Sequence, residues 1–312
     1  MLRRRLASLL VLAGCASVGC SASVDAAEPS ASRSSAVPVV LTTFTVLADM
    51  VQVVGGPQVQ VESLLEVGRE VHGYEPTPAD LRRAAGADLL IANGLGLEGW
   101  LDGLLAPLDL PRVTLTDRIE PILVRSGEYE GLANPHAWMS PVVGQQYVEA
   151  IADALATLAP RHSRLFAERA EAYSVTLDEL HDQTVERLAT VPTSARVLVT
   201  CEGAFSYLAR DAGLEEVYLW AVNADRQGTP RQVADAITTV RDRGVPAVFC
   251  ESTVSSTGQE QVARESGATF GGVLYVDSLS EADGPVPTYL DLLRHDVEVI
   301  VAGLTRSQEV VG

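Results

Sequence analysis

The stretch that decides the fold runs from Pro160 to Pro192 and reads PRHSRLFAERAEAYSVTLDELHDQTVERLATVP. Apolar or small residues recur in it at alternating steps of three and four, which places them on one narrow stripe of a helix: Phe166, Ala170, Tyr173, Leu177, Leu180, Thr184, Leu188 and Val191. At 1.5 Å per residue such a helix would be about 45 Å long, longer than one small lobe. The pattern predicts a rigid linker helix over residues 160–191 that joins two lobes; a long surface helix of a single domain is the alternative.

Short apolar runs alternate with helical segments on both sides of this stretch. Strands are predicted at 39–44, 59–65, 89–92 and 113–115 before it, and at 197–200, 217–220, 247–250 and 271–276 after it. This alternation predicts parallel sheets with helices on both faces. The expected fold is therefore α/β, with two (βα)4 lobes at 38–159 and 192–312 and a site in the cleft between them.

The charge of the chain excludes some classes of partner. The formal net charge is -18 over 312 residues, and all 23 basic residues are arginine. An acidic surface repels phosphate backbones, so nucleic-acid binding is disfavoured. The same surface is compatible with concentrating cations, although it selects no particular metal.

The N-terminus has the features of a targeting segment. Arg3 to Arg5 precede a short apolar run that ends in Leu12-Ala13-Gly14-Cys15. This order resembles the lipobox of bacterial lipoproteins, which implies a signal peptide over 1–14 and lipidation of Cys15; Cys20 is a weaker candidate. Residues 15–37 are rich in Ser, Ala and Pro and predict a flexible tether. The expected location is the outer face of the cytoplasmic membrane, through a lipid anchor.

Two cysteines, Cys201 and Cys250, each lie at the end of an apolar run. They might pair in an oxidising compartment, but the sequence does not place their α-carbons within bonding distance. Buried free thiols are the favoured interpretation.

Four side chains with metal-binding chemistry follow predicted strands. His72 and His136 lie in loops that contain Gly or Pro, while Glu202 and Asp277 come directly after strands of the second lobe. Ligands of such sheets bind outside the carboxyl ends of the strands. Each residue alone is better explained as a structural loop residue or a helix cap; only the set of four points to a metal.

Several motifs in order resemble those of bacterial substrate-binding lipoproteins that hand manganese, iron or zinc to ABC importers. The matching stretches, between about Val39 and Thr305, are His72 with Tyr74-Glu75-Pro76-Thr77-Pro78, Asn93-Gly94, Pro135-His136-Ala137-Trp138, Glu202-Gly203-Ala204-Phe205, Gly228-Thr229-Pro230, Glu251-Ser252, Asp277-Ser278-Leu279 and Asp283-Gly284-Pro285. The resemblance implies that His72, His136, Glu202 and Asp277 bind the metal and that a long helix joins two four-stranded lobes. One departure is Glu70-Val71, where the family often has Asp-Pro before the first histidine.

Two imidazoles and two carboxylates suit manganese or ferrous iron, and zinc would bind them as well. Two features favour manganese as the transported ion. Glu202 stands where zinc-type relatives more often carry His, and residues 117–134 contain no histidine. The resemblance also implies a membrane permease as partner and a monomer that performs no bond chemistry. Glu251, at a strand end, is a candidate for fixing an imidazole tautomer.

Two other classes of function compete with transport. A metalloenzyme usually leaves a coordination position open for water, and four protein ligands leave little room for it. The chain also lacks the HExxH, GxSxG and P-loop patterns. A surface adhesin that uses metal only for folding is the third class.

Overall fold

The computed structural model describes residues 37–125, 129–222 and 228–305. The predicted signal peptide, Cys15 and nearly all of the predicted tether lie outside the described residues. Among the described helices, none has the length and apolar character needed to cross a membrane.

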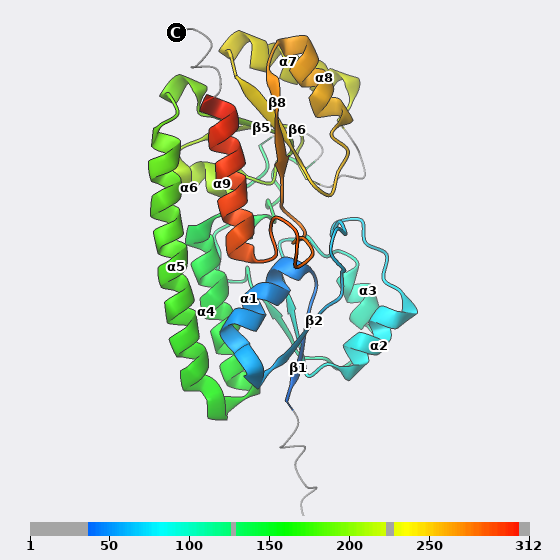
Figure 1. Ribbon diagram of the computed structural model, residues 1–312. Coiled ribbons are helices and arrows are strands. Elements are labelled where there is room, and N and C mark those ends of the chain that lie inside the picture. Colours follow the sequence, from blue (N-terminus) through cyan, green and yellow to red (C-terminus); the bar gives the residue numbers. More distant parts are fainter. Residues whose placement is uncertain (1–36, 126–128, 223–227, 306–312) are drawn as a thin grey trace, which may run out of the picture. The chain divides into compact units, whose positions relative to one another are not determined.

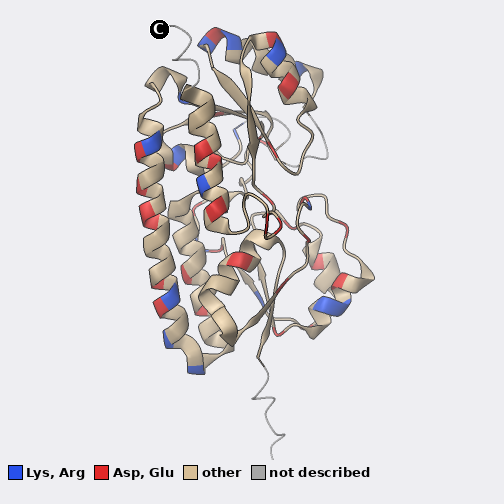
Figure 2. Cartoon of the chain, in the orientation of Figure 1, with Lys and Arg blue, Asp and Glu red and all other residues tan. Residues whose placement is uncertain are grey.

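The predicted linker is a continuous helix, α5 (Ser163–Ala189), preceded by a short 3-10 turn at Pro160–His162. Its buried residues from Phe166 to Leu188 are those of the predicted stripe. The helix is about 40 Å long at 1.5 Å per residue. It runs beside both the first-lobe and the second-lobe elements of residues 37–305 (Figure 1), packs against α4 (Pro141–Leu158) and α9 (Tyr289–Thr305), and carries acidic and basic residues along its length (Figure 2).

The first lobe contains one parallel sheet in the order β2-β1-β3-β4. Its strands are β1 (Val39–Thr42), β2 (Gln60–Ser63), β3 (Leu89–Ala92) and β4 (Arg112–Thr114). Its helices are α1 (Thr45–Gly55), α2 (Pro78–Gly86), α3 (Leu101–Leu105) and α4, with 3-10 turns at Gly56–Gln58 and Ala137–Met139. Because all four strands are parallel, their carboxyl ends share one edge of the sheet.

The second lobe contains its four predicted strands. Its strands form two parallel pairs, β5-β6 and β7-β8. They are β5 (Val197–Glu202), β6 (Glu215–Trp220), β7 (Ala247–Glu251) and β8 (Thr269–Leu274), and β5 lies beside β7. The helices α6 (Ser206–Ala212), α7 (Pro230–Arg243), α8 (Thr257–Ser266) and α9 accompany them, with a 3-10 turn at Thr193–Ala195 before β5. Side-chain contacts rather than a continuous backbone ladder therefore join the two pairs.

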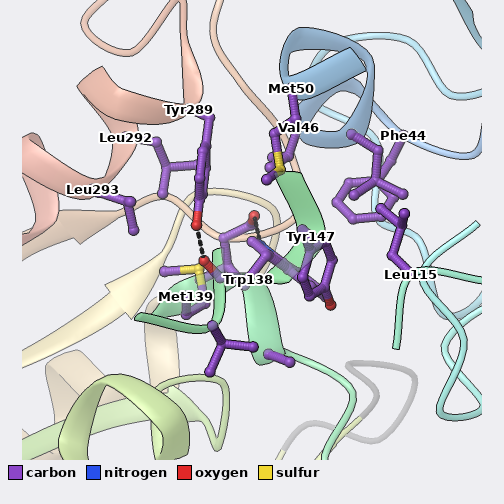
Figure 3. Close-up of a cluster of buried hydrophobic side chains, with 14 of the residues drawn as sticks. Phe44, Val46, Met50, Leu115, Trp138, Met139, Tyr147, Tyr289, Leu292 and Leu293 are labelled. Atoms are coloured by element: carbon purple, nitrogen blue, oxygen red, sulfur yellow. Dashed lines mark hydrogen bonds between the residues drawn. The ribbon is translucent and has the colours of Figure 1, made fainter. Parts of the chain in front are cut away.

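One apolar cluster continues from the first lobe into the second. Figure 3 shows Trp138 and Met50 packed near Tyr289 and Leu292 of α9. The Tyr289 hydroxyl donates to the carbonyl of Trp138, and both side chains are fully buried. Burial of this kind contributes about 25 cal/mol for each Å² of apolar surface, so the two lobes are held together by a shared core as well as by α5.

Candidate metal centre

The four predicted ligands come from the carboxyl ends of strands in both lobes. His72 lies in the loop after β2, and His136 immediately precedes the 3-10 turn at Ala137–Met139. Glu202 is the last residue of β5, and Asp277 follows β8. The predicted order of strands and loops thus brings side chains from four separated segments toward the same end of their sheets.

Three of the four form a close group. The Nε2 atoms of His72 and His136 are 3.2 Å apart, and the Glu202 Oε1 lies 3.5 Å from the first and 3.8 Å from the second. Their ligand atoms all fall within 4.8 Å of one another. The three side chains are at most 5% exposed. Two nitrogen atoms and a carboxylate oxygen that converge in a buried space are a donor set that suits a divalent transition metal.

Asp277 does not belong to this close group, but it is buried on the same side. Both of its carboxylate oxygens are buried and lack a hydrogen-bond partner within the described residues. The segment around it contacts the other ligand segments: Gly68 N–H donates to Ser278 Oγ over 2.6 Å, and Trp138 Nε1–H donates to the Val276 carbonyl over 3.1 Å. Unpartnered buried carboxylate oxygens are costly, and a cation would provide the missing partner.

The orientation of His136 follows from Asn134. The imidazole Nδ1 lies 2.9 Å from Asn134 Oδ1, which can only accept a hydrogen bond. The hydrogen of His136 is therefore on Nδ1, and the lone pair of Nε2 faces His72 and Glu202. The role of Asn134 was not predicted from the sequence. Its position two residues before His136 is the available signal, because it allows an Asx-turn in which Asn134 Oδ1 also accepts from His136 N–H over 3.0 Å.

The loop that carries His72 is shaped by Glu70 and by the start of α2. The Glu70 carboxylate accepts from the backbone N–H of His72 and of Gly73 over 2.9 and 3.0 Å. Thr77 is the N-cap of α2 and forms a capping box with Asp80. Glu70, which replaces the family's usual residue here, therefore folds the loop through hydrogen bonds to its own backbone.

Glu202 is fixed by its neighbours in the second lobe. Its N–H donates to Glu251 Oε2 over 3.2 Å. The prediction that Glu251 fixes an imidazole is wrong. Within the described residues, Asn134 orients the imidazole of His136, and Glu251 accepts a hydrogen bond from the Glu202 backbone. Glycine is required at position 203, next to Glu202, since a Cβ there would lie 2.7 Å from the Ala221 carbonyl oxygen.

The electrostatics of the site follow from burial without charge compensation. Burial lowers the pKa of His72 to about 4, and burial together with the nearby His72 lowers the pKa of His136 well below its usual value. Both imidazoles are thus neutral at pH 7. Burial, with a contribution from Glu70, raises the pKa of Asp277 to about 8, and burial raises that of Glu251 to about 8. The carboxyl groups of Asp277 and Glu251 therefore favour protonation in the absence of a cation. This behaviour is expected where a bound positive charge would stabilise the ionised forms.

The expectation of free thiols is wrong. Cys201 and Cys250 form a disulfide bond, with α-carbons 4.9 Å apart. They pair because β5 and β7 are neighbours although 49 residues separate the cysteines along the chain. The bond joins the two strand pairs of the second lobe directly before Glu202 and Glu251.

Comparison with known proteins identifies the family of the chain. A family model described as "Zinc-uptake complex component A periplasmic" matches residues 40–303. The chain belongs to this family. The chain is 46% identical to the iron-binding protein YfeA of Yersinia pestis, over 85% of each chain. It is 32% identical to the manganese-binding lipoprotein MntA of Halalkalibacterium halodurans, over 86% of this chain and 88% of that one.

Other relatives of the family add the transport context and the fold. The metal ABC transporter substrate-binding lipoprotein SloC of Streptococcus mutans is 27% identical, over 86% of this chain and 90% of that one. The Mn-bound structure of a periplasmic metal binding protein from Candidatus Liberibacter asiaticus is 39% identical and superposes with a TM-score of 0.80, covering 86% of this chain and 99% of that one. Of these two relatives, SloC is named as the substrate-binding lipoprotein of a metal ABC transporter.

Proposed function

We propose that this protein captures a divalent transition metal outside the cytoplasmic membrane and delivers it to the permease of an ABC importer. Manganese is the metal that we favour. The observation that carries the proposal is the group of His72 Nε2, His136 Nε2 and a Glu202 oxygen within 4.8 Å. Asp277, whose buried oxygens have no partner in the described chain, is proposed as the fourth ligand.

The mechanism consists of capture, retention and release without bond chemistry. The neutral imidazoles offer lone pairs at Nε2, and the carboxyl group of Asp277, whose pKa burial raises to about 8, loses its proton as the cation binds. Two ligands come from each lobe, so the bound ion would link the lobes at the carboxyl ends of their strands. Release would then require the permease to separate ligands of one lobe from those of the other.

Manganese is favoured by the chemistry of the chain. A carboxylate at Glu202 is harder than an imidazole, and hard oxygen ligands suit Mn²⁺ better than a set dominated by nitrogen. Residues 117–134 also contain no histidine that could add nitrogen ligands. Iron is the rival metal, since ferrous iron accepts the same donors and the relative that is 46% identical is named iron-binding.

We further propose that Cys15 carries a lipid anchor and that the protein acts as a monomer. Removal of residues 1–14 and lipidation of Cys15 would tether the folded unit through residues 15–37. Replacement of Cys15 by serine is expected to release the protein from membranes without changing its metal affinity. Retention on membranes after Cys15→Ser would contradict the anchor.

The proposed function is tested by calorimetry on metal-free protein with Mn²⁺, Zn²⁺ and, without oxygen, Fe²⁺. One ion for each chain is expected, and Glu202→Gln, which keeps the shape of the side chain, is expected to weaken binding at least about tenfold. The matched control is Glu215→Gln, which removes an exposed carboxylate paired with Arg243. Equal affinity of wild type and Glu202→Gln would contradict the proposed site.

The choice of metal is tested by uptake of radioactive manganese and zinc into host cells that lack this protein. Loss of manganese uptake with retained zinc uptake supports the assignment. Loss of zinc uptake alone would overturn it. Hydrolase activity in the purified protein, or unfolding on chelation, would instead favour the metalloenzyme or the metal-stabilised adhesin.

A further inference from the structure

Asn134 lies between the segment that carries His136 and the segment that carries Glu202. Its Oδ1 accepts from the Nδ1 and the backbone N–H of His136. Its Nδ2 donates to the Gly203 carbonyl over 2.6 Å and to Ser206 Oγ over 3.1 Å. A flipped amide would place its NH₂ group against the donors of His136 and its oxygen against the Gly203 carbonyl, so only one orientation is compatible with these neighbours.

The hydrogen-bond chain continues from Asn134 to a carboxylate in the second lobe. Ser206 Oγ donates to Glu216 Oε2 over 2.5 Å, and Phe205 N–H donates to Glu216 Oε1 over 2.7 Å. An ionised carboxylate only accepts, so the Ser206 hydrogen must point to Glu216 and its lone pairs remain for Asn134. Each bond therefore runs in one direction, from the imidazole of His136 to the anion at Glu216, and bonds aligned in this way polarise one another.

We propose that Ser206 and Glu216 are positioning residues of the metal site: acting through Asn134, they hold His136 in the tautomer whose Nε2 faces the ion. This inference rests on the proposed function, since it concerns how one of its ligands is oriented. This chain of hydrogen bonds begins at His136 in the first lobe and ends at Glu216 on β6 of the second lobe. The bonds from Asn134 Nδ2 to Gly203 and Ser206 therefore contribute to this orientation only while the two lobes are docked at Asn134.

A separate set of bonds anchors the backbone at Asn134 without Ser206. The Tyr207 hydroxyl donates to the Asn134 carbonyl over 2.8 Å and accepts from the Ile122 N–H over 3.1 Å. Asn134 N–H donates to the Ile122 carbonyl over 2.8 Å. Loss of the Ser206 hydroxyl therefore removes a partner of the Asn134 side chain while the position of the loop is retained, which separates positioning from folding.

Four variants distinguish positioning from general packing. Ser206→Ala interrupts the chain of hydrogen bonds, and Ser206→Thr restores a hydroxyl at the same place. Glu216→Gln keeps the shape of the side chain but offers one acceptor oxygen where Phe205 N–H and Ser206 O–H need two. The matched control is Glu215→Gln, one residue earlier on β6, whose carboxylate pairs with Arg243 away from the chain.

The experiment uses the full chain with ¹⁵N-labelled imidazoles, studied without metal by long-range ¹H–¹⁵N spectra and then titrated with Mn²⁺ and Zn²⁺ by calorimetry. Burial raises the pKa of Glu216 to about 7, so pH 8 keeps it ionised. Wild type, Ser206→Thr and Glu215→Gln are expected to show His136 with its hydrogen on Nδ1 and equal affinities. Ser206→Ala and Glu216→Gln are expected to populate the second tautomer and to bind about 10–100-fold more weakly.

An unchanged tautomer or an unchanged affinity in either Ser206→Ala or Glu216→Gln would overturn the proposal, as would a failure of Ser206→Thr to behave as wild type. Failure of the proposed function has a different signature. In that case the wild-type protein binds neither ion, while the tautomer spectra of the metal-free protein still report whether Ser206 and Glu216 orient His136.

Discussion

Cys201 and Cys250 are joined by a disulfide bond, and each directly precedes a buried glutamate, Glu202 and Glu251. The same pair of strands therefore carries a covalent link and, one residue later, the hydrogen bond from Glu202 N–H to Glu251 Oε2. The disulfide holds together the two strand pairs of the second lobe at the point where one of them presents a proposed metal ligand.

Removal of this disulfide by Cys201→Ala with Cys250→Ala is expected to lower the free energy of unfolding by about 4 kcal/mol, the chain-entropy estimate for a loop of this length. Denaturant unfolding of the metal-free protein measures it. Reductant should bring the wild type to the level of the double variant and leave the variant unchanged. Equal stability of the two oxidised proteins would show that strand contacts alone join the pairs.

Asp277→Asn separates a ligand from a structural carboxylate. Both oxygens of Asp277 lack a partner within the described chain, so the substitution removes no intramolecular hydrogen bond there. Metal affinity is expected to fall at least about tenfold, by analogy with the loss of other metal-site groups. Thermal unfolding without metal should be unchanged or occur at a higher temperature. A less stable metal-free protein with unchanged affinity would place Asp277 outside the metal site.

Metal removal is expected to lower stability without unfolding the protein. The apolar core is complete without an ion, with side chains such as Trp138 and Tyr147 fully buried. An ion present at 100 times its dissociation constant should add about 2.7 kcal/mol to the free energy of unfolding. Chelator titration followed by circular dichroism should show unchanged helix content and a lower melting temperature. Loss of helix content would assign the metal a folding role.

Because α5 is a continuous helix, we expect only a small change in the shape of the protein on metal binding. α5 is continuous over both lobes and packs on α4 and α9, and the core around Trp138 and Tyr289 crosses between the lobes. Breaking this core would expose apolar surface, so a wide hinge opening is disfavoured. Small-angle scattering should give nearly equal radii of gyration for metal-free and metal-loaded protein. A clear expansion on metal removal would contradict this rigidity.

Asp80 gives a prediction for acid stability. Burial alone would raise the pKa of Asp80, but hydrogen bonds from Thr77, Tyr74 and Arg83 lower it to about 2. A lowered pKa in the folded state contributes stability above the usual value near 4, and this stability is lost as the pH falls toward 2. Asp80→Asn should therefore cost about 2 kcal/mol at pH 7, and the difference from wild type should shrink between pH 4 and pH 2.

Urea unfolding at several pH values measures this difference. The control is Asp153→Asn, which removes an exposed ion pair with Arg118 and is expected to change stability by at most about 1 kcal/mol at any pH. An Asp80→Asn penalty that persists undiminished at low pH would show that shape rather than charge makes Asp80 stabilising.

The sequence by itself determined the local elements and the kind of site. The stripe from Phe166 to Leu188 specifies α5, because apolar spacing of 3.6 residues defines one helical face. Thr77-Pro78 and Thr229-Pro230 mark helix starts that the structure confirms as capping boxes. The positions of His72, His136 and Glu202 after strands also indicated their convergence, since parallel strands share one carboxyl edge.

Only the tertiary structure decided what depends on contacts between distant segments. The neighbourhood of β5 and β7 pairs Cys201 with Cys250, and no spacing in the sequence encodes which strands become neighbours. The Asn134 side chain reaches across to Gly203 and Ser206, so the amide that faces His136 is also held from the second lobe. Local patterns record hydrophobic periodicity and turn chemistry, whereas strand neighbours and cross-lobe hydrogen bonds are fixed only when the cores of the two lobes pack together.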